Sequence, residues 1–400
     1  MNEPEDRITV TISEMVHGGG AIARHNDQVV FVDYGIPGEE VVVLIERRKR
    51  QYMEGRVVEV VKASPHRVAP PCPYFGTCGG CQVQHIEYSH QLELKRAVVE
   101  DALRRIGKFS EPPVKPTVPC ANPWSYRNHA RFTIDRYGMV GFVRRKSHRF
   151  LPIEECRIMH PWINDALREL QGKCGETTQV SIRYGASTGE WLIQPRLKSP
   201  AVGLASGQPH YTEALLGHSF RVSSPSFFQV NTPQAETLAK LVKESALGGE
   251  PSGQEFVVDA YAGVGTFAVL LSPHVARVLA VEESAAAIKD AMVNLDGIAN
   301  VELVKGKVED ALPTLLQRPD AVLLDPSRNG CHRRVIDALI ELKPLKIVYV
   351  SCDPATLARD LRLLCEEGIF TLVDVQPVDM FPQTYHIECV AALTLAGDMH

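Results

Sequence analysis

Cys352 stands where an apolar run ends and a helical pattern begins. The preceding segment, Ile347 to Val350, is β-branched and aromatic, which predicts a buried strand. Asp353 and Pro354 then have the order of an N-cap and a first helical residue. Because the N-terminal end of a helix dipole lowers the pKa of a nearby thiol, we expect a reactive thiolate at Cys352. A small buried residue that closes a strand has the same local pattern, so this stretch alone leaves both interpretations open.

Acidic residues and glycines follow the other apolar runs of the C-terminal half. "VVDAYAGVGTF" contains Asp259, Gly263 and Gly265, "LAVE" ends at Glu282, and "LLDPSRNG" contains Asp325. Ligands bind beyond the carboxyl ends of the strands in a doubly wound sheet, so these residues predict one site. An acid after the second strand suits ribose hydroxyls, and the missing third glycine favours a nucleoside without a pyrophosphate. S-adenosylmethionine fits this site, because its cationic sulfonium tolerates nearby carboxylates. The alternative is a purely structural role, in which the glycines allow close helix packing and the acids cap the strand ends.

A nucleophilic thiol beside a methyl donor restricts the reaction. Methyl transfer to oxygen or nitrogen needs no covalent catalysis. Methyl transfer to a poorly nucleophilic carbon does need it. C5 of a pyrimidine is such a carbon: sulfur adds at C6, C5 then attacks the methyl group, and a base removes the C5 proton before the sulfur leaves.

A second site is indicated by "CPYFGTCGGCQVQH". Cys72, Cys78 and Cys81 have the spacing C-x5-C-x2-C, and Cys156 in "EECRIMHP" is a fourth candidate. Such an array can hold zinc or an iron-sulfur cluster, and the spacing does not choose between them. The chain has ten cysteines, which metal ligation or catalysis explains better than disulfides, with unrelated reduced thiols as the alternative.

Length and composition predict a multidomain cytoplasmic protein. Its 400 residues, 44% of them hydrophobic, are enough for two or three domains of about 150 residues each. There is no apolar run of membrane-spanning length, and the acidic N-terminus "MNEPEDRITVTI" is unlike a signal peptide. We expect no membrane association and a monomer.

The charge is unevenly distributed. A net charge of −5 argues weakly against a globally basic nucleic-acid binder. Between residues 111 and 150, however, basic residues that include Arg127 and Arg131 outnumber acidic ones and alternate with aromatic residues. This mixture suits phosphates and unstacked bases, although a solvated basic face over an aromatic core is the alternative.

The periodicity of the chain predicts three structural regions. From Arg7 to Val61, short alternating runs separated by glycine-rich turns predict four or five strands in a small barrel. An amphipathic helix near residues 90–107 follows a proline-rich turn, and residues 120–220 have a mixed α/β pattern. After "FFQVNTPQAETL", strands and helices alternate, which predicts a doubly wound parallel sheet.

These segments resemble the class I RNA uracil-5 methyltransferases. The resemblance is carried by "FFQVNTPQAETL", "DAYAGVGTFAVLL", "AVEESAAAIKDA", "LLDPSRNG", "SCDPATLARD" and "HIECVAAL", and residues 8–62 resemble the TRAM barrel, an OB-like RNA-binding module. It implies a TRAM barrel at 1–62, a central α/β iron-sulfur domain at 63–220 and a Rossmann-like methyltransferase domain at 221–400. The helix near 90–107 is expected to pack on the catalytic domain.

The resemblance also implies roles for individual residues. Cys352 would be the nucleophile and Glu388 the acceptor of the C5 proton, although a glutamate in an apolar last strand can simply be exposed at an edge. The four cysteines would hold a 4Fe-4S cluster, and Arg127, Arg131 and Arg328 would approach RNA. Contacts to S-adenosylmethionine are implied for Gln229, Tyr261, Thr266, Glu282 and Asp325.

Two departures from the family pattern concern substrate contacts rather than the reaction. Asp353 replaces a common Asn, and DPSR at 325–328 replaces DPPR. The expected function is methylation of uracil C5 in structured RNA, with 23S ribosomal RNA as the leading target and the T-loop of transfer RNA as the alternative. A non-catalytic RNA-binding protein and an iron-sulfur oxidoreductase are the competing classes.

Overall fold

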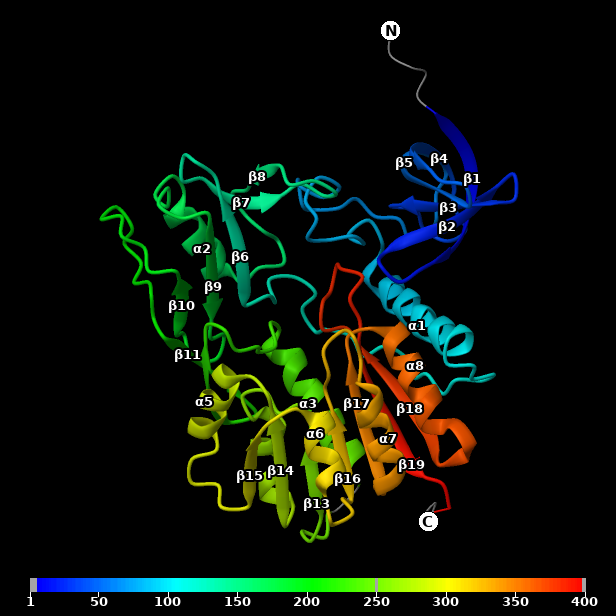
Figure 1. The fold of residues 1–400 in the computed structure, drawn as a ribbon. Helices are drawn as coiled ribbons and strands as arrows, with labels where there is room; N and C mark the ends of the chain where they lie inside the picture. The colour runs from blue at the N-terminus through cyan, green and yellow to red at the C-terminus, as the bar shows by residue number, and fades with distance from the viewer. Residues whose placement is uncertain (1–5, 249–250, 398–400) are drawn as a thin grey trace.

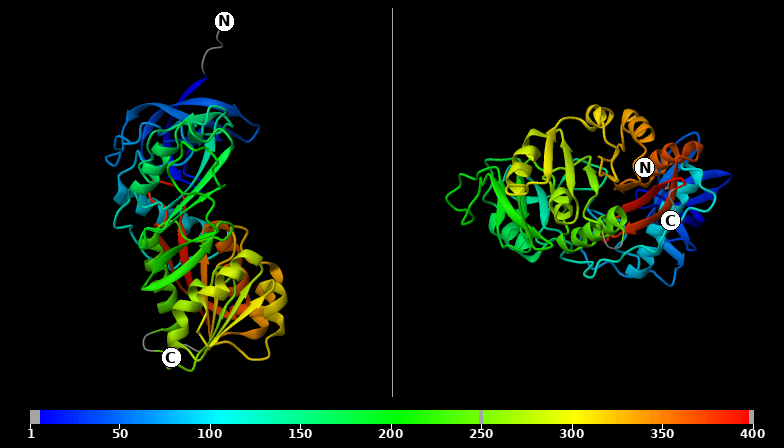
Figure 2. Two further views of the ribbon diagram at one scale, coloured as in Figure 1. Left: turned by 90° about the vertical axis from the view of Figure 1, so that its left-hand side faces the viewer. Right: turned by 90° about the horizontal axis from the view of Figure 1, so that it is seen from below.

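The structure is a computed structural model and describes residues 6–248 and 251–397. An N-terminal barrel and a central sheet lie side by side above a C-terminal sheet flanked by helices (Figure 1). A side view places the barrel and the C-terminal sheet at opposite ends of an elongated molecule (Figure 2). Within the two described ranges, no helix combines the length and hydropathy needed to cross a membrane.

The barrel consists of five strands in the closed order β1-β2-β3-β5-β4. Alternate residues such as Val30 and Val32 are fully buried inside it, as the period of a strand requires. The barrel predicted from the sequence is therefore confirmed. Its strands are β1 (Arg7–Met15), β2 (Gly20–His25), β3 (Gln28–Asp33), β4 (Glu40–Arg48) and β5 (Tyr52–Lys62).

Helix α1 (Tyr88–Arg105) follows the barrel and shares its core with the C-terminal sheet. Val98, Val99 and Leu103 of α1 are buried in the same hydrophobic cluster as Tyr349. The helix packs against α8 (Pro354–Cys365) and β18 (Phe370–Val378). It therefore lies between the barrel and the C-terminal sheet (Figure 1).

The central region contains a sheet with the order β10-β9-β6-β7-β8 and a separate hairpin, β11-β12. Its core forms where Phe132 and Ile182 of the sheet meet Ile163 and Leu167 of α2. Its elements are β6 (His129–Ile134), β7 (Val140–Val143), β8 (Phe150–Pro152), α2 (Pro161–Leu170), β9 (Gln179–Tyr184), β10 (Trp191–Gln194), β11 (His210–Leu215) and β12 (His218–Ser223).

The C-terminal sheet has seven strands in the order β15-β14-β13-β16-β17-β19-β18. Strands β13 to β17 are parallel, as the alternating pattern predicts, and β19 runs antiparallel to both β17 and β18. The strands are β13 (Phe256–Asp259), β14 (Arg277–Glu282), β15 (Val301–Lys305), β16 (Ala321–Leu324), β17 (Lys346–Ser351), β18 (Phe370–Val378) and β19 (Glu388–Leu395). The remaining helices are α3 (Thr232–Leu247), α4 (Thr266–Leu271), α5 (Ala285–Asn294), α6 (Val308–Ala311) and α7 (Arg333–Leu342), with 3-10 turns at Ser272–His274, Leu312–Thr314 and Glu366–Gly368.

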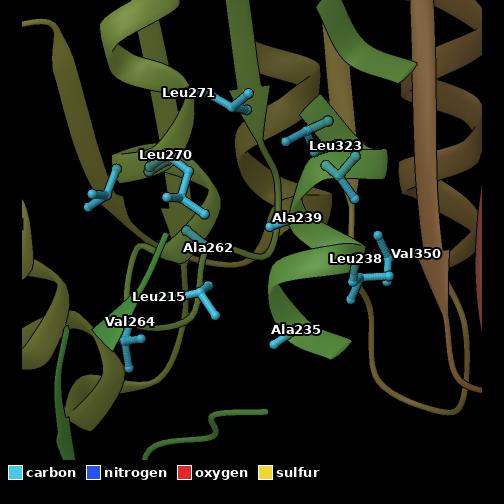
Figure 3. Close-up of a cluster of buried hydrophobic side chains, with 14 of the residues drawn as sticks. Leu215, Ala235, Leu238, Ala239, Ala262, Val264, Leu270, Leu271, Leu323 and Val350 are labelled. Atoms are coloured by element: carbon cyan, nitrogen blue, oxygen red, sulfur yellow. The ribbon is translucent and has the colours of Figure 1, made fainter. Parts of the chain in front are cut away.

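Helices cover both faces of this sheet, and each face has its own hydrophobic core. On one face, Leu238 and Ala239 of α3 pack toward Leu323 of β16 and Val350 of β17 (Figure 3). The strand order reverses between β13 and β16, which opens a crevice at their carboxyl ends. Those ends face the barrel and the central sheet (Figure 1).

Candidate active site

A cavity of about 540 Å³ lies at the carboxyl ends of these strands. Cys352 and Glu388 both line it, together with Arg328. The five side chains expected to contact the methyl donor line the same cavity: Gln229, Tyr261, Thr266, Glu282 and Asp325. The tertiary structure thus brings together residues at or just after the carboxyl ends of four strands, one residue from the start of β19 and one from the turn before α3.

The turn after β13 is built for close approach of a ligand. Gly263 and Gly265 have φ angles of +56° and +86°, in the left-handed region that favours glycine. The backbone N–H of Gly263 donates to Glu282 Oε2 at 2.9 Å, and that of Ser284 donates to Glu282 Oε1 at 2.6 Å. Glu282 is therefore fixed at the end of β14 with its carboxylate beside the glycine turn.

Two acids lie at the ends of neighbouring strands: Asp259 is buried at the end of β13, and Asp325 is partly buried just after β16. Burial raises the pKa of Asp259 to about 7, with a further contribution from the nearby Asp325. Burial also raises the pKa of Asp325 to about 7. Asp259 accepts a hydrogen bond from the backbone N–H of Ala268 at 3.1 Å and does not line the cavity, so it supports α4, whereas Asp325 faces the cavity.

The local structure around Cys352 is the predicted one. Asp353 is the N-cap of α8, and its Oδ1 accepts from the backbone N–H groups of Ala355 and Thr356 at 3.0 and 2.9 Å. Cys352 lies at the end of β17 and is partly buried.

The expected direction of the Cys352 pKa is wrong for the free protein. Burial raises this pKa to about 11, and the neighbouring Glu388 raises it as well, while Arg328 lowers it. The helix N-terminus, which was expected to lower the pKa of Cys352, carries only a partial charge at the surface of the site. Its effect is smaller than the loss of hydration and the repulsion between two anions at close range. The thiol is therefore protonated near neutral pH in the free protein.

Glu388 is the first residue of β19, and its side chain is only 5% exposed. Strand β19 lies between β17 and β18, so the alternative of an exposed edge residue is wrong. Among residues 6–248 and 251–397, nothing pairs with its Oε2 atom. Burial raises the pKa of Glu388 well above its ordinary value, Asp325 raises it further, and Arg328 opposes both effects.

His386 also lines the cavity, although it is not among the site residues expected from the sequence. Its Nδ1 atom lies 3.5 Å from Nη2 of Arg328. Its ring packs against those of Tyr385 and Phe381. The sequence spacing could have indicated that His386 belongs to the site, because a residue two positions before Glu388 lies on the same side of an extended chain.

The four cysteines of the second predicted site line another cavity, of about 490 Å³. Cys72, Cys78 and Cys81 come from one loop, and Cys156 approaches from the segment before α2. All ten cysteines of the chain are free thiols. In the described part of the chain, no three His, Cys, Asp or Glu side chains are close enough to hold a single metal ion.

The predicted RNA-contacting arginines are divided between the two cavities. Arg127 and Arg131 line the cysteine cavity, whereas Arg328 lines the first one. His386 lines both, so the cavities are neighbours.

Part of the basic segment has a structural role instead. Arg145 and Lys146 pair with Asp33 of the barrel at 2.6 and 2.7 Å, which joins the central region to the barrel. These two cations contribute less to a free basic surface than the sequence suggests.

The fold and the site define an S-adenosylmethionine-dependent methyltransferase with an RNA-binding barrel. The family model for tRNA (uracil-5-)-methyltransferases matches residues 217–395, and the TRAM domain model matches residues 5–58. An uncharacterized RNA methyltransferase from Halalkalibacterium halodurans is 35% identical, over 98% of this chain and 97% of its own length. Another, from Thermosynechococcus vestitus, is 36% identical over 97% of this chain and 98% of its own.

A solved structure extends the likeness to the whole fold. The tRNA (uracil-54, C5)-methyltransferase of Pyrococcus abyssi, in complex with S-adenosyl-L-homocysteine, superimposes with a TM-score of 0.76. It is 25% identical and covers 97% of this chain and 100% of its own. The chain belongs to the RNA uracil-5 methyltransferase family, and it is an enzyme that uses S-adenosylmethionine.

Proposed function

We propose that this enzyme methylates C5 of a uridine in 23S ribosomal RNA through a covalent adduct of Cys352. The observation that carries the proposal is the shared cavity: the thiol and the buried carboxyl of Glu388 face the space where the methyl donor is expected. The enzyme is proposed to act as a monomer. We place it in the cytoplasm, where its free thiols stay reduced.

The residues of the cavity fit S-adenosylmethionine. Gln229 Oε1 is buried and has no hydrogen-bond partner among the described residues, so a ligand that donates to it would remove the cost of leaving it unpaired. Glu282 is placed for ribose hydroxyls, and Asp325 favours a nearby cation. The bound donor supplies an electrophilic methyl group.

Cys352 begins the reaction. It gives up its proton to solvent, and its sulfur forms a bond to C6 of uracil, which moves electron density to C5. C5 then takes the methyl group, and the sulfur of the donor keeps the electron pair of the broken bond. Arg328 lowers the pKa of Cys352 and is therefore the residue that favours the thiolate.

Glu388 completes the reaction by accepting the C5 proton. The electrons of the C5–H bond form the C5–C6 double bond, and the C6–S bond breaks to return the thiolate. Repulsion between Cys352 and Glu388 means that the pair does not readily carry two negative charges. Formation of the adduct removes the charge of the thiolate, so Glu388 becomes easier to ionise at the step that needs a base.

The proposed target is supported by two separate basic surfaces. One is the loop between β4 and β5, where Lys49 and Arg50 are exposed, and the other includes Arg131 and Arg149 of the central region. Because C5 and C6 are inaccessible in a stacked helix, the base must be flipped out or lie in a rearranged loop. Two spaced surfaces can hold such a loop at both ends.

The T-loop of transfer RNA is the second candidate, because the similar Pyrococcus abyssi enzyme acts on uracil-54 of tRNA. Mapping 5-methyluridine in ribosomal and transfer RNA from a strain that lacks the gene separates the two. Loss from 23S ribosomal RNA alone is expected. Loss from the T-loop alone would contradict the ribosomal assignment and leave the chemistry intact.

We also propose that Cys72, Cys78, Cys81 and Cys156 hold a 4Fe-4S cluster with a structural role. The proposal is supported by the position of these four thiols, which line one cavity of about 490 Å³. The cysteine spacing fits zinc as well, and the family resemblance is what implies the cluster. Anaerobic purification should give brown protein with about four irons per chain; colourless protein with one zinc would contradict this assignment.

A further inference from the structure

Lys95 of α1 contacts both ends of the loop that leads into Glu388. This loop, residues 379–387, connects β18 to β19 and rises between α1 and the central region (Figure 1). The Lys95 ammonium donates to Asp379 Oδ1 at 2.6 Å and to the carbonyl of Phe381 at 3.2 Å at the start of the loop. It also donates to the carbonyl of His386 at 2.9 Å at the end of the loop.

Each N–H group of the Lys95 ammonium can donate to its own acceptor. A lysine has three N–H donors and no acceptor, and Lys95 has three acceptors. The side chain of Lys95 is 5% exposed and that of Asp379 is 0% exposed. A buried ion pair of this kind is weak evidence for extra stability, because desolvation offsets the attraction, so a role in specifying one conformation is the better explanation.

Other side chains hold the same loop from outside. The hydroxyl of Tyr88 donates to Asp379 Oδ2 at 2.8 Å, and that of Tyr126 donates to the carbonyl of Pro382 at 3.0 Å. Tyr88 therefore holds the start of the loop and Tyr126 its middle. Within the loop, the Thr384 hydroxyl donates to the carbonyl of Phe381 at 2.8 Å and accepts from the N–H of His386 at 3.3 Å. Lys95 adds to these local contacts by reaching both ends of the loop from α1.

The loop carries part of the active site. Phe381 and His386 line the cavity with Glu388, and Glu388 follows the carbonyl bound by Lys95 after only one intervening residue. A displacement of about 1 Å at a reacting group can cost about 100-fold in rate. The position of the Glu388 carboxyl therefore depends on how tightly the two ends of the loop are held.

We propose that Lys95 is a positioning residue for the proton-transfer step. It closes the loop at residues 379–387 and so places Glu388 against the C5 proton of the Cys352 adduct. This inference rests on the proposed function, because it assigns the same base. It predicts a specific defect: the adduct forms and receives the methyl group, but it resolves slowly.

Lys95→Met tests the proposal, since methionine keeps most of the unbranched side chain and loses all three donors. RNA and labelled methyl donor are mixed with excess enzyme, samples are denatured at intervals, and adduct and free methylated RNA are separated on a gel. Formation of the labelled adduct should stay within about 3-fold of wild type, and its release should slow about 10- to 100-fold. Lys115→Met is the matched control, because it removes an exposed 2.7 Å ion pair to Asp374 of β18 and should change neither rate.

A second variant separates positioning from stability. Lys95→Met leaves the Asp379 carboxylate buried and unpaired, which lowers the melting temperature. Lys95→Met combined with Asp379→Asn removes that charge and retains an acceptor for Tyr88. The double variant should recover its melting temperature and still release RNA slowly.

The outcomes are distinguishable. Release at the wild-type rate in Lys95→Met, or in the double variant once its melting temperature has recovered, would overturn the role of Lys95 and leave the proposed function intact. A wild-type enzyme that produces no Cys352 adduct and no 5-methyluridine would overturn the proposed function, and the role of Lys95 with it.

Discussion

Glu388→Gln should separate formation of the covalent adduct from its resolution. Glutamine has the shape of a protonated carboxyl group, and burial favours the protonated form of Glu388 by raising its pKa well above the ordinary value. The atom that changes, Oε2, has no partner among the described residues, so no hydrogen bond of the structure is lost. We therefore expect unchanged thermal stability and nearly normal attack by Cys352.

Only the proton-transfer step should lose its catalyst. General base catalysis typically contributes about 10²- to 10⁴-fold in rate. At about 1.4 kcal/mol per tenfold, this is about 3 to 6 kcal/mol of activation free energy. Release of methylated RNA from Glu388→Gln should slow by this factor while the labelled adduct accumulates.

The assay is a denaturing gel of enzyme mixed with RNA and labelled methyl donor. Protein and RNA should migrate together as a labelled band, and mass spectrometry should place the link on Cys352. Free RNA that carries the methyl group at the normal rate would refute the assignment of Glu388 as the base. An unlabelled adduct would instead show that the change blocks methyl transfer.

Three further changes probe the nucleophile and the RNA surface. Cys352→Ala should abolish 5-methyluridine formation and leave donor affinity, measured by calorimetry, within about 2-fold, because the thiol acts on the acceptor. Alkylation of Cys352 by iodoacetamide, followed on its peptide, should rise about tenfold per pH unit from 7 to 10, since its pKa of about 11 keeps most of the thiol protonated throughout that range. Arg328→Met removes the neighbour that lowers this pKa, so alkylation at a given pH should become slower, and a faster reaction would contradict the charge analysis. Replacing Lys49 and Arg50 of the barrel with serine should weaken RNA binding and reduce the steepness of its salt dependence, with donor affinity unchanged; an unaltered salt dependence would exclude this loop from the RNA surface.

The sequence was sufficient to predict the architecture, because hydrophobic periodicity is a local property. Alternation with period two indicated the barrel, and alternating strands and helices indicated the doubly wound sheet. The gathering of Glu282, Asp325 and Cys352 in one cavity was also predictable, since parallel strands bring their carboxyl ends to the same edge of a sheet.

The energetics of the site depended on tertiary structure. The pKa of Cys352 is raised by burial and by Glu388, a residue from another strand, and neither effect is visible in the local sequence. Arg145 was expected on a basic surface and instead pairs with Asp33 of the barrel. Both differences arise because electrostatic interactions depend on distance and hydration rather than on sequence spacing.

The clearest case is the contact between Lys95 and Asp379, which are 284 residues apart. In the sequence, Lys95 is one cation of an amphipathic helix, and such residues usually face solvent. Only the packing of α1 against β18 buries it and turns its ammonium toward the loop before Glu388. The sequence determined which elements form and which side chains meet at the strand ends, while long-range packing decided which charges are buried and what they hold in place.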